Sequence, residues 1–291
     1  PEGLVSIPAR TFYNNSALTS VTIPTTVRND NAERAIGQFA FYNCAKLSEV
    51  IFTKGGSESL SFAGGAFSGC DSLTKLSLPA RIASMDTSKF DVFELGTNGS
   101  TNDGDFNMVN CNVYAWKNSF TSGAKDISNI AEIEVEEGGA EFSSYKGVLY
   151  NADKSVLVWC PFGKVGEVEV AKETTKFRAS AFNNCHYITS VVFEKGGTAD
   201  FVMEDNTKTG TFDGTTPFFG CFNLKTITFP TRLKSLGSNA LKNDTGITEY
   251  TPDGTKFYST GTAITKVLFE DGCKLESIGN NAFEKIEIDE L

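Results

Sequence analysis

One phrase recurs along this chain of 291 residues. A Phe is followed three residues later by Cys or Asn and six residues later by Leu or Ile. The copies begin at Phe12, Phe41, Phe67, Phe182 and Phe218. A catalytic site needs no such copies, whereas stacked copies of one supersecondary unit need the same residues in every layer. The repeat therefore predicts a solenoid in which each layer packs against its neighbours.

A short strand is predicted after each copy. Two apolar residues flank one outward residue, as in Val50 and Phe52 or Leu76 and Leu78. Alternation of this kind, rich in β-branched and aromatic residues, indicates a strand with one buried face. Two degenerate copies show the same spacing, at 130–135 and 264–269. Upstream of the Phe, an apolar residue and a Gly, such as Ile36 and Gly37, predict a second inward stretch in each layer.

The residue pattern of these copies resembles that of leucine-rich repeats of the BspA type, found in surface and secreted proteins of bacteria and some protozoa. Residues 142–161, "FSSYKGVLYNADKSVLVWCP", resemble the hairpin that interrupts such arrays, with 151–154 as its turn. The expected fold is a strand-rich α/β repeat solenoid of the leucine-rich-repeat type. Short parallel strands would form one face, and turns with short helical or 3₁₀ segments the other.

The whole chain, 1–291, is predicted to be one solenoid domain. Regular repeats occupy 1–80, and repeats with the hairpin insertion occupy 130–291. In 81–129, which holds Cys111 and Trp116, the template is nearly lost, so this region is a degenerate or inserted repeat.

Stacking in register would place the Phe side chains of successive layers about 4.8 Å apart as a buried spine. The Cys of each copy would occupy a tight inward turn as a buried structural thiol, at Cys44, Cys70, Cys185 and Cys221. Asn15 fills the same slot in the first copy, where its amide can hydrogen-bond the turn backbone. Seven cysteines cannot all pair internally, and side chains in a ladder have the wrong dihedral for an easy disulfide.

Signals for catalysis and metal binding are weak. His186, the only histidine, lies beside a ladder Cys and is expected to be an exposed turn imidazole. The loop 97–107 carries oxygen ligands at Asn98, Asn102, Asp103 and Asp105, but their order does not match a calcium loop. Neither a phosphate loop nor a dinucleotide or Gly-x-Ser-x-Gly motif occurs. We expect no enzyme activity, no cofactor and no bound metal.

Composition limits the partners. The chain has 36 acidic and 26 basic residues, a net charge of -10, and no basic run that could neutralise phosphates, which disfavours nucleic acid. Its apolar stretches fall short of the roughly 20 residues that span a bilayer, so membrane insertion is not expected. The chain begins at Pro1, inside a repeat, without a recognisable signal peptide or anchor. The resemblance implies a secreted or cell-surface protein.

One residue of each strand is predicted to point outward, between the two buried ones. These residues are Thr22, Ile51, Ser77, Glu134, Val192, Thr228 and Leu268. Ile51, Val192 and Leu268 have no reason to be apolar if this face meets only water. Aromatic residues near the turns form a second candidate surface, at Tyr13, Tyr42, Tyr187 and Phe219.

Two functions fit the sequence. The first is a non-enzymatic recognition module whose exposed strand face binds an extracellular protein or glycan; the resemblance implies adhesion or host interaction. The alternative is a structural spacer or self-associating solenoid within a larger surface protein.

Overall fold

The structure is a computed structural model. It describes residues 3–29, 35–63, 66–67, 69–83, 130–161, 163–178, 181–182, 185, 187–204, 217–218, 221, 223–242, 247–250, 256–259 and 264–286. The chain divides into two compact units, unit 1 (Pro1–Gly147) and unit 2 (Val148–Leu291), which are described separately.

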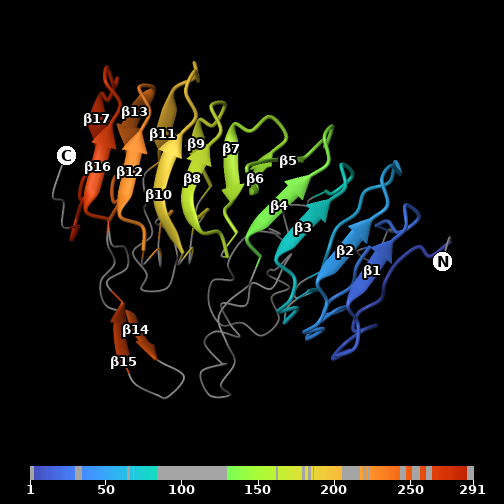
Figure 1. The fold of residues 1–291 in the computed structure, drawn as a ribbon. Coiled ribbons are helices and arrows are strands. Elements are labelled where there is room, and N and C mark those ends of the chain that lie inside the picture. Colours follow the sequence, from blue (N-terminus) through green and yellow to red (C-terminus); the bar gives the residue numbers. More distant parts are fainter. Residues whose placement is uncertain are drawn as a thin grey trace. The chain divides into compact units, whose positions relative to one another are not determined.

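The described part of unit 1 contains short strands (Figure 1). The strands are β1 (Ser20–Ile23), β2 (Glu49–Phe52), β3 (Lys75–Leu78), β4 (Glu132–Val135) and β5 (Phe142–Tyr145). Of these, β5 belongs to a sheet with β6 (Val148–Asn151), β7 (Val156–Trp159) and β9 (Lys176–Phe177). β1 pairs with β2 and β3 pairs with β4, both in parallel, but no ladder joins β2 to the neighbouring β3. A second row of parallel bridges joins Ile7 to Ile36 and Ile36 to Phe62. Each of these layers thus has two inward stretches, as the Ile36 pattern predicts.

Unit 2 has two rows of parallel strands (Figure 1). The first row, in spatial order, is β16 (Lys266–Phe269), β12 (Thr226–Phe229), β10 (Ile188–Phe193) and β8 (Gly166–Val170). The second row is β11 (Phe201–Met203), β13 (Leu233–Leu236) and β17 (Ser277–Ile278). The alternation of buried and outward residues follows the predicted period of two, since Val191 and Phe193 are buried and Val192 is half-buried.

The predicted hairpin is present in unit 2. β6 (Val148–Asn151) pairs antiparallel with β7 (Val156–Trp159), and residues 152–155 form the turn. Asp153 accepts hydrogen bonds from the backbone N–H and the hydroxyl of Ser155, which fixes the turn and lowers the pKa of this carboxyl. β7 then pairs in parallel with β9 (Lys176–Phe177), so the hairpin returns the chain to the repeat.

Two features differ from the sequence-based expectation. Among the described residues the connections between strand rows are turns, and none is an α-helix or a 3₁₀ segment. A second antiparallel pair, β14 (Ile247–Tyr250) with β15 (Lys256–Ser259), is present in a segment for which we predicted no strand.

Stacked Phe rings form the predicted spine. In unit 1 the Phe12 and Phe41 ring centroids lie 5.1 Å apart, and those of Phe41 and Phe67 also lie 5.1 Å apart with parallel planes. In unit 2 the Phe182 and Phe218 rings lie 5.0 Å apart. All but Phe12 are fully or almost fully buried. Burial of each ring stabilises the fold by roughly 2–3 kcal/mol, so the spine is a large part of the core.

The repeated Cys holds successive layers in register. Sγ of Cys44 donates to the carbonyl of Phe12 (3.1 Å), and Sγ of Cys70 donates to that of Phe41 (3.2 Å). Sγ of Cys221 donates to the carbonyl of Phe182 in the same way (3.0 Å). The prediction of buried structural thiols is confirmed, and burial raises the pKa of Cys44, Cys70 and Cys221.

Asn15 confirms the predicted role of its slot. Its Oδ1 accepts hydrogen bonds from the backbone N–H groups of Ala17 and Leu18, both at 3.1 Å. Cys160 shares no spacing with the ladder cysteines but is also buried. Its carbonyl accepts a hydrogen bond from Sγ of Cys185 (3.3 Å). Every described cysteine is a free thiol.

An arginine from one layer reaches back to carbonyl groups of earlier layers in each unit. Nη1 of Arg81 donates to the carbonyls of Val27 (2.6 Å) and Glu58 (3.2 Å). Nη1 of Arg232 donates to the carbonyls of Thr174 and Ala199. Both arginines lie two residues after a strand-ending Pro, and burial lowers the pKa of both. These contacts satisfy backbone acceptors in the segments that connect the strands.

Candidate functional site

The outward residues of unit 1 lie in rows across the strands. Thr22 pairs with Ile51 and Ser77 pairs with Glu134 in the parallel ladders. All four side chains are exposed, and 43% of Ile51 is accessible to solvent. The structure therefore brings together the unit 1 residues of the predicted face.

The outward residues of unit 2 also lie side by side across parallel strands. Thr228 pairs with Leu268, and Val192 pairs with Glu169 of β8. Val192, Thr228 and Leu268 are half-buried rather than exposed, so these positions offer less surface than those of unit 1. Glu169 was absent from the sequence-based set, although the alternation in "GEVEV" at 166–170 would have revealed it.

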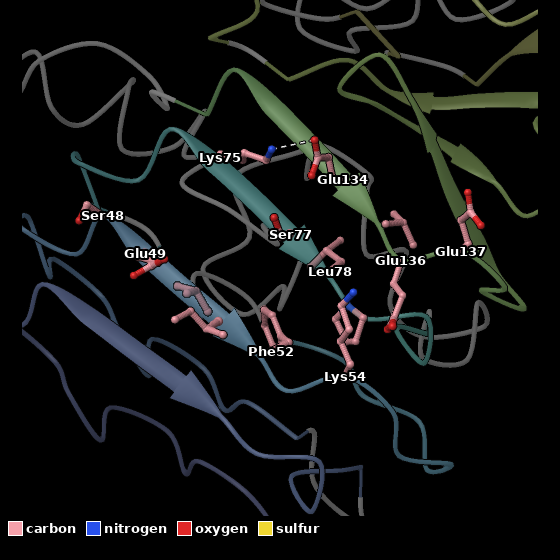
Figure 2. A pocket seen from close by; sticks show the side chains of 14 residues that line it. Ser48, Glu49, Phe52, Lys54, Lys75, Ser77, Leu78, Glu134, Glu136 and Glu137 are labelled. Atoms are coloured by element: carbon pink, nitrogen blue, oxygen red, sulfur yellow. Dashed lines mark ion pairs between the residues drawn. The ribbon is translucent and has the colours of Figure 1, made fainter.

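A depression of about 1060 Å³ lies on the strand face of unit 1 (Figure 2). Residues of β2, β3 and β4 and of the turns that follow these strands line it. Ile51, Ser77 and Glu134 of the predicted row contribute to its surface. Glu49, Lys54, Glu136 and Glu137 also line it and were not predicted as site residues.

The charged groups of the depression are partly paired. Nζ of Lys75 lies 2.7 Å from Oε1 of Glu134 and 3.9 Å from Oε2 of Glu132 (Figure 2). The hydrogen bond to Glu134 raises the pKa of Lys75, which is therefore a stable cation. Oε2 of Glu136 accepts the backbone N–H of Ala80 (3.2 Å). Lys75 and Glu136 thus both have partners within the protein.

The aromatic residues near the turns form a separate surface in unit 1. The Tyr13 and Tyr42 rings stack at 4.9 Å, and the Phe39 ring meets Tyr42 edge-on at 5.4 Å. The guanidinium of Arg10 lies 5.9 Å from the centre of the Tyr13 ring. In unit 2, Tyr187 is 42% exposed. Stacking thus covers part of the ring surface in unit 1, although Tyr13 is still 44% exposed.

Several residues singled out in the sequence lie outside the described residues. They are Asn98, Asn102, Asp103, Asp105, Cys111, Trp116, His186 and Phe219. Among the residues that the structure does describe, no group of three or more His, Cys, Asp or Glu side chains is placed to hold a metal ion.

The match of the repeats to a family model establishes the family. The model of the BspA type leucine rich repeat region matches residues 5–134 and 214–291 with six copies. The chain belongs to this BspA-type leucine-rich repeat family. The spine rings Phe12, Phe41, Phe67 and Phe218 and the ladder thiols Cys44, Cys70 and Cys221 lie within the residues that match this BspA-type model.

Solved bacterial structures resemble this BspA-type chain over most of its length. The pneumococcal vaccine antigen PcpA has 20% identity over 91% of this chain and 52% of that protein, with a TM-score of 0.44. This chain therefore spans about half the length of PcpA. A leucine-rich repeat protein from Eubacterium ventriosum has 15% identity over 100% of this chain and 82% of that one, with a TM-score of 0.33.

A leucine rich cell surface protein from Faecalibacterium prausnitzii has 15% identity over 91% of this BspA-type chain and 83% of that one, with a TM-score of 0.29. The comparison with curated proteins finds no match. Within the described part of the chain, no helix has the length and apolar character needed to cross a membrane.

Proposed function

We propose that this BspA-type chain is a non-enzymatic recognition module of a secreted or cell-surface protein. Its exposed strand face binds an extracellular protein or glycan, in an adhesive or host-interaction role. The observation that carries the proposal is the depression over β2, β3 and β4, which contains Ile51, Ser77 and Glu134 of the outward row. A rigid sheet that presents polar and aliphatic side chains in register suits a macromolecular ligand that contacts several layers.

A binding screen tests the proposal. The purified chain is exposed to arrays of glycans and extracellular matrix proteins, and each ligand found is measured against Ile51→Asp and Ser77→Arg in unit 1 and Thr228→Arg in unit 2. Val165→Asp is the matched control, because Val165 is 71% exposed and lies outside the strand face. Weakened binding by a strand-face variant but not by the control supports the proposal. Unchanged binding by all three strand-face variants overturns it.

The alternative function is a spacer or self-associating solenoid. Exposed Ile51 also suits contact with a second copy of the chain, because an apolar side chain on a sheet gains from burial. Sedimentation velocity distinguishes the two functions. A concentration-dependent dimer that Ile51→Asp dissociates, without any ligand in the screen, favours self-association.

A further inference from the structure

Four turns that follow strands share one backbone geometry. Each holds a glycine with positive φ, at Gly55 (87°), Gly138 (85°), Gly196 (90°) and Gly272 (80°). Two residues before each glycine, a backbone N–H donates to the last residue of the neighbouring parallel strand, as that of Glu270 does to the carbonyl of Phe229 (3.0 Å). The residue directly before the glycine is a lysine in two of the turns, Glu137 in the third and Asp271 in the fourth. The fourth turn therefore differs from the others, because its carboxyl group is one methylene away from the backbone.

The side chain of Asp271 and the backbone of Gly272 are both accessible. Both residues are exposed, and a Cβ atom placed on Gly272 would meet nothing within 4 Å apart from its chain neighbours. Among the described residues, no acceptor binds the backbone N–H of Gly272 and no donor binds the carboxyl of Asp271. Asp153 differs, because the N–H and the hydroxyl of Ser155 hold its carboxyl. The carboxyl of Asp271 is thus free to reach the nitrogen of the next residue.

We propose that Asp271 is a site of spontaneous covalent modification, at which the backbone converts to isoaspartate. The backbone nitrogen of Gly272 attacks Cγ of the protonated Asp271 carboxyl. An N–Cγ bond forms, and the carboxyl OH leaves with the amide proton as water, which gives a five-membered succinimide. Water then adds to the backbone carbonyl carbon of Asp271 and breaks its bond to the nitrogen, so the chain continues through Cγ.

The identity of both residues favours this reaction. Gly272 has no side chain that would crowd the attacking nitrogen or the ring. Glu137 occupies the same position before Gly138 and is equally exposed. Its longer side chain would have to close a six-membered ring, which forms less readily. The Glu137 turn is therefore an internal control within the same chain.

Conversion lengthens the backbone by one methylene inside a turn that is held at both ends. The N–H of Cys273 donates to the carbonyl of Glu270 (3.0 Å) and closes the turn. Oε2 of Glu270 accepts the N–H of Thr231 (3.1 Å), and the N–H of Lys274 donates to the carbonyl of Thr231 (2.9 Å). Extra length at residue 271 displaces these groups, so the segment between β16 and β17 should lose its attachment to the preceding layer.

Peptide mapping of the full chain after several weeks at neutral pH and body temperature tests the proposal. Trypsin cleavage after Lys266 and Lys274 isolates Asp271 from the other Asx-Gly pairs of the sequence, which lie outside the described residues at Asn98, Asp103, Asp213 and Asp253. The 267–274 peptide should separate into two species of equal mass, and protein isoaspartyl methyltransferase should methylate the new one. The peptide that holds Glu137 should not be methylated at that residue. Asp271→Glu should abolish the new species.

A synthetic peptide of residues 267–274, incubated beside the chain, separates the effect of the fold from the intrinsic chemistry. We expect the intact chain to convert at a rate similar to that of the free peptide. Conversion of the peptide without conversion of the chain would overturn the proposal, because the fold would then block the attack. Absence of isoaspartate at residue 271 in both would overturn it as well. Amide hydrogen exchange in 273–278 should be faster in the aged chain than in aged Asp271→Glu, and equal exchange would overturn the predicted loss of attachment.

Discussion

A Cβ atom placed on Gly197 would lie 2.5 Å from Nε of Arg232 and 2.3 Å from the carbonyl oxygen of Lys172. Unit 1 repeats the relationship with more room, since a Cβ on Gly56 would lie 3.2 Å from Nε of Arg81. The second Gly of each "KGG" therefore leaves space for an arginine that arrives from the next layer. Arg232 lies against two aromatic rings in this space, at 5.8 Å from the centres of both Phe193 and Phe201.

Gly197→Ala should destabilise unit 2 by about 1–3 kcal/mol, the usual cost of forcing extra volume into a packed site. Part of this cost is a clash with backbone, which cannot move aside as a flexible side chain can. The measurement is urea unfolding followed by circular dichroism. Gly196→Ala measures backbone strain alone, because its Cβ would meet open space while its φ of 90° costs an alanine about 1–3 kcal/mol. A loss below about 1 kcal/mol for Gly197→Ala would contradict the packing argument.

Arg232→Met should lower the free energy of unfolding by about 1–3 kcal/mol. Methionine fills part of the space but leaves the carbonyl of the buried Thr174 without its donor, and an unsatisfied buried group costs about 1–3 kcal/mol. Arg232→Lys should lose less, since an ammonium group can still donate to one carbonyl. If the methionine and lysine variants unfold at the same urea concentration, the hydrogen bonds are not the source of the stabilisation.

Cys221→Ser should cost less than Cys221→Val. The serine hydroxyl can keep the bond to the carbonyl of Phe182, whereas valine has no donor and should cost about 1–3 kcal/mol. Thermal unfolding of the two variants measures the difference. Cys273→Val is the control, because Sγ of Cys273 is only half-buried and lies 3.7 Å from the nearest carbonyl acceptor, that of Pro230. A valine variant as stable as the serine variant would show that the slot needs only volume.

Stability should fall at alkaline pH because burial raises the pKa of Cys70 and Cys221. Above the ordinary thiol pKa of about 9, these thiols ionise in the unfolded chain but remain protonated in the fold. Unfolding then releases protons, so the free energy of unfolding falls by up to about 1.4 kcal/mol per pH unit for each thiol. Urea midpoints between about pH 7 and 10.5 should therefore decline less steeply in Cys70→Ser, Cys221→Ser. Identical slopes would contradict the assignment.

The spine and the strand rows could be predicted because they depend on spacing that every layer repeats. The spacing of Phe41, Cys44 and Leu47 identifies one layer, and Val50 and Phe52 form the buried face of its strand. β8 was missed because no Phe-x-x-Cys phrase precedes "GEVEV". Without that phrase, a five-residue strand is easily taken for a loop.

Contacts between layers were not predictable from spacing. Arg81 donates to the carbonyl of Val27, 54 residues earlier in the chain, and nothing near either residue announces this bond. The full lining of the depression could not be predicted from spacing either. Ile51, Ser77 and Glu134 follow from strand alternation, but Lys54 and Glu137 join them only because their turns fold toward the same face.

The thiol of one repeat donates a hydrogen bond to the Phe carbonyl of the repeat before it, whatever the length of chain between them. The Cys70 bond spans 29 residues and the Cys221 bond spans 39, yet their lengths are 3.2 and 3.0 Å. Alignment of the repeats is thus independent of the connecting segments. An engineer could graft foreign loops between these repeats, and evolution could diversify them, without disturbing the scaffold.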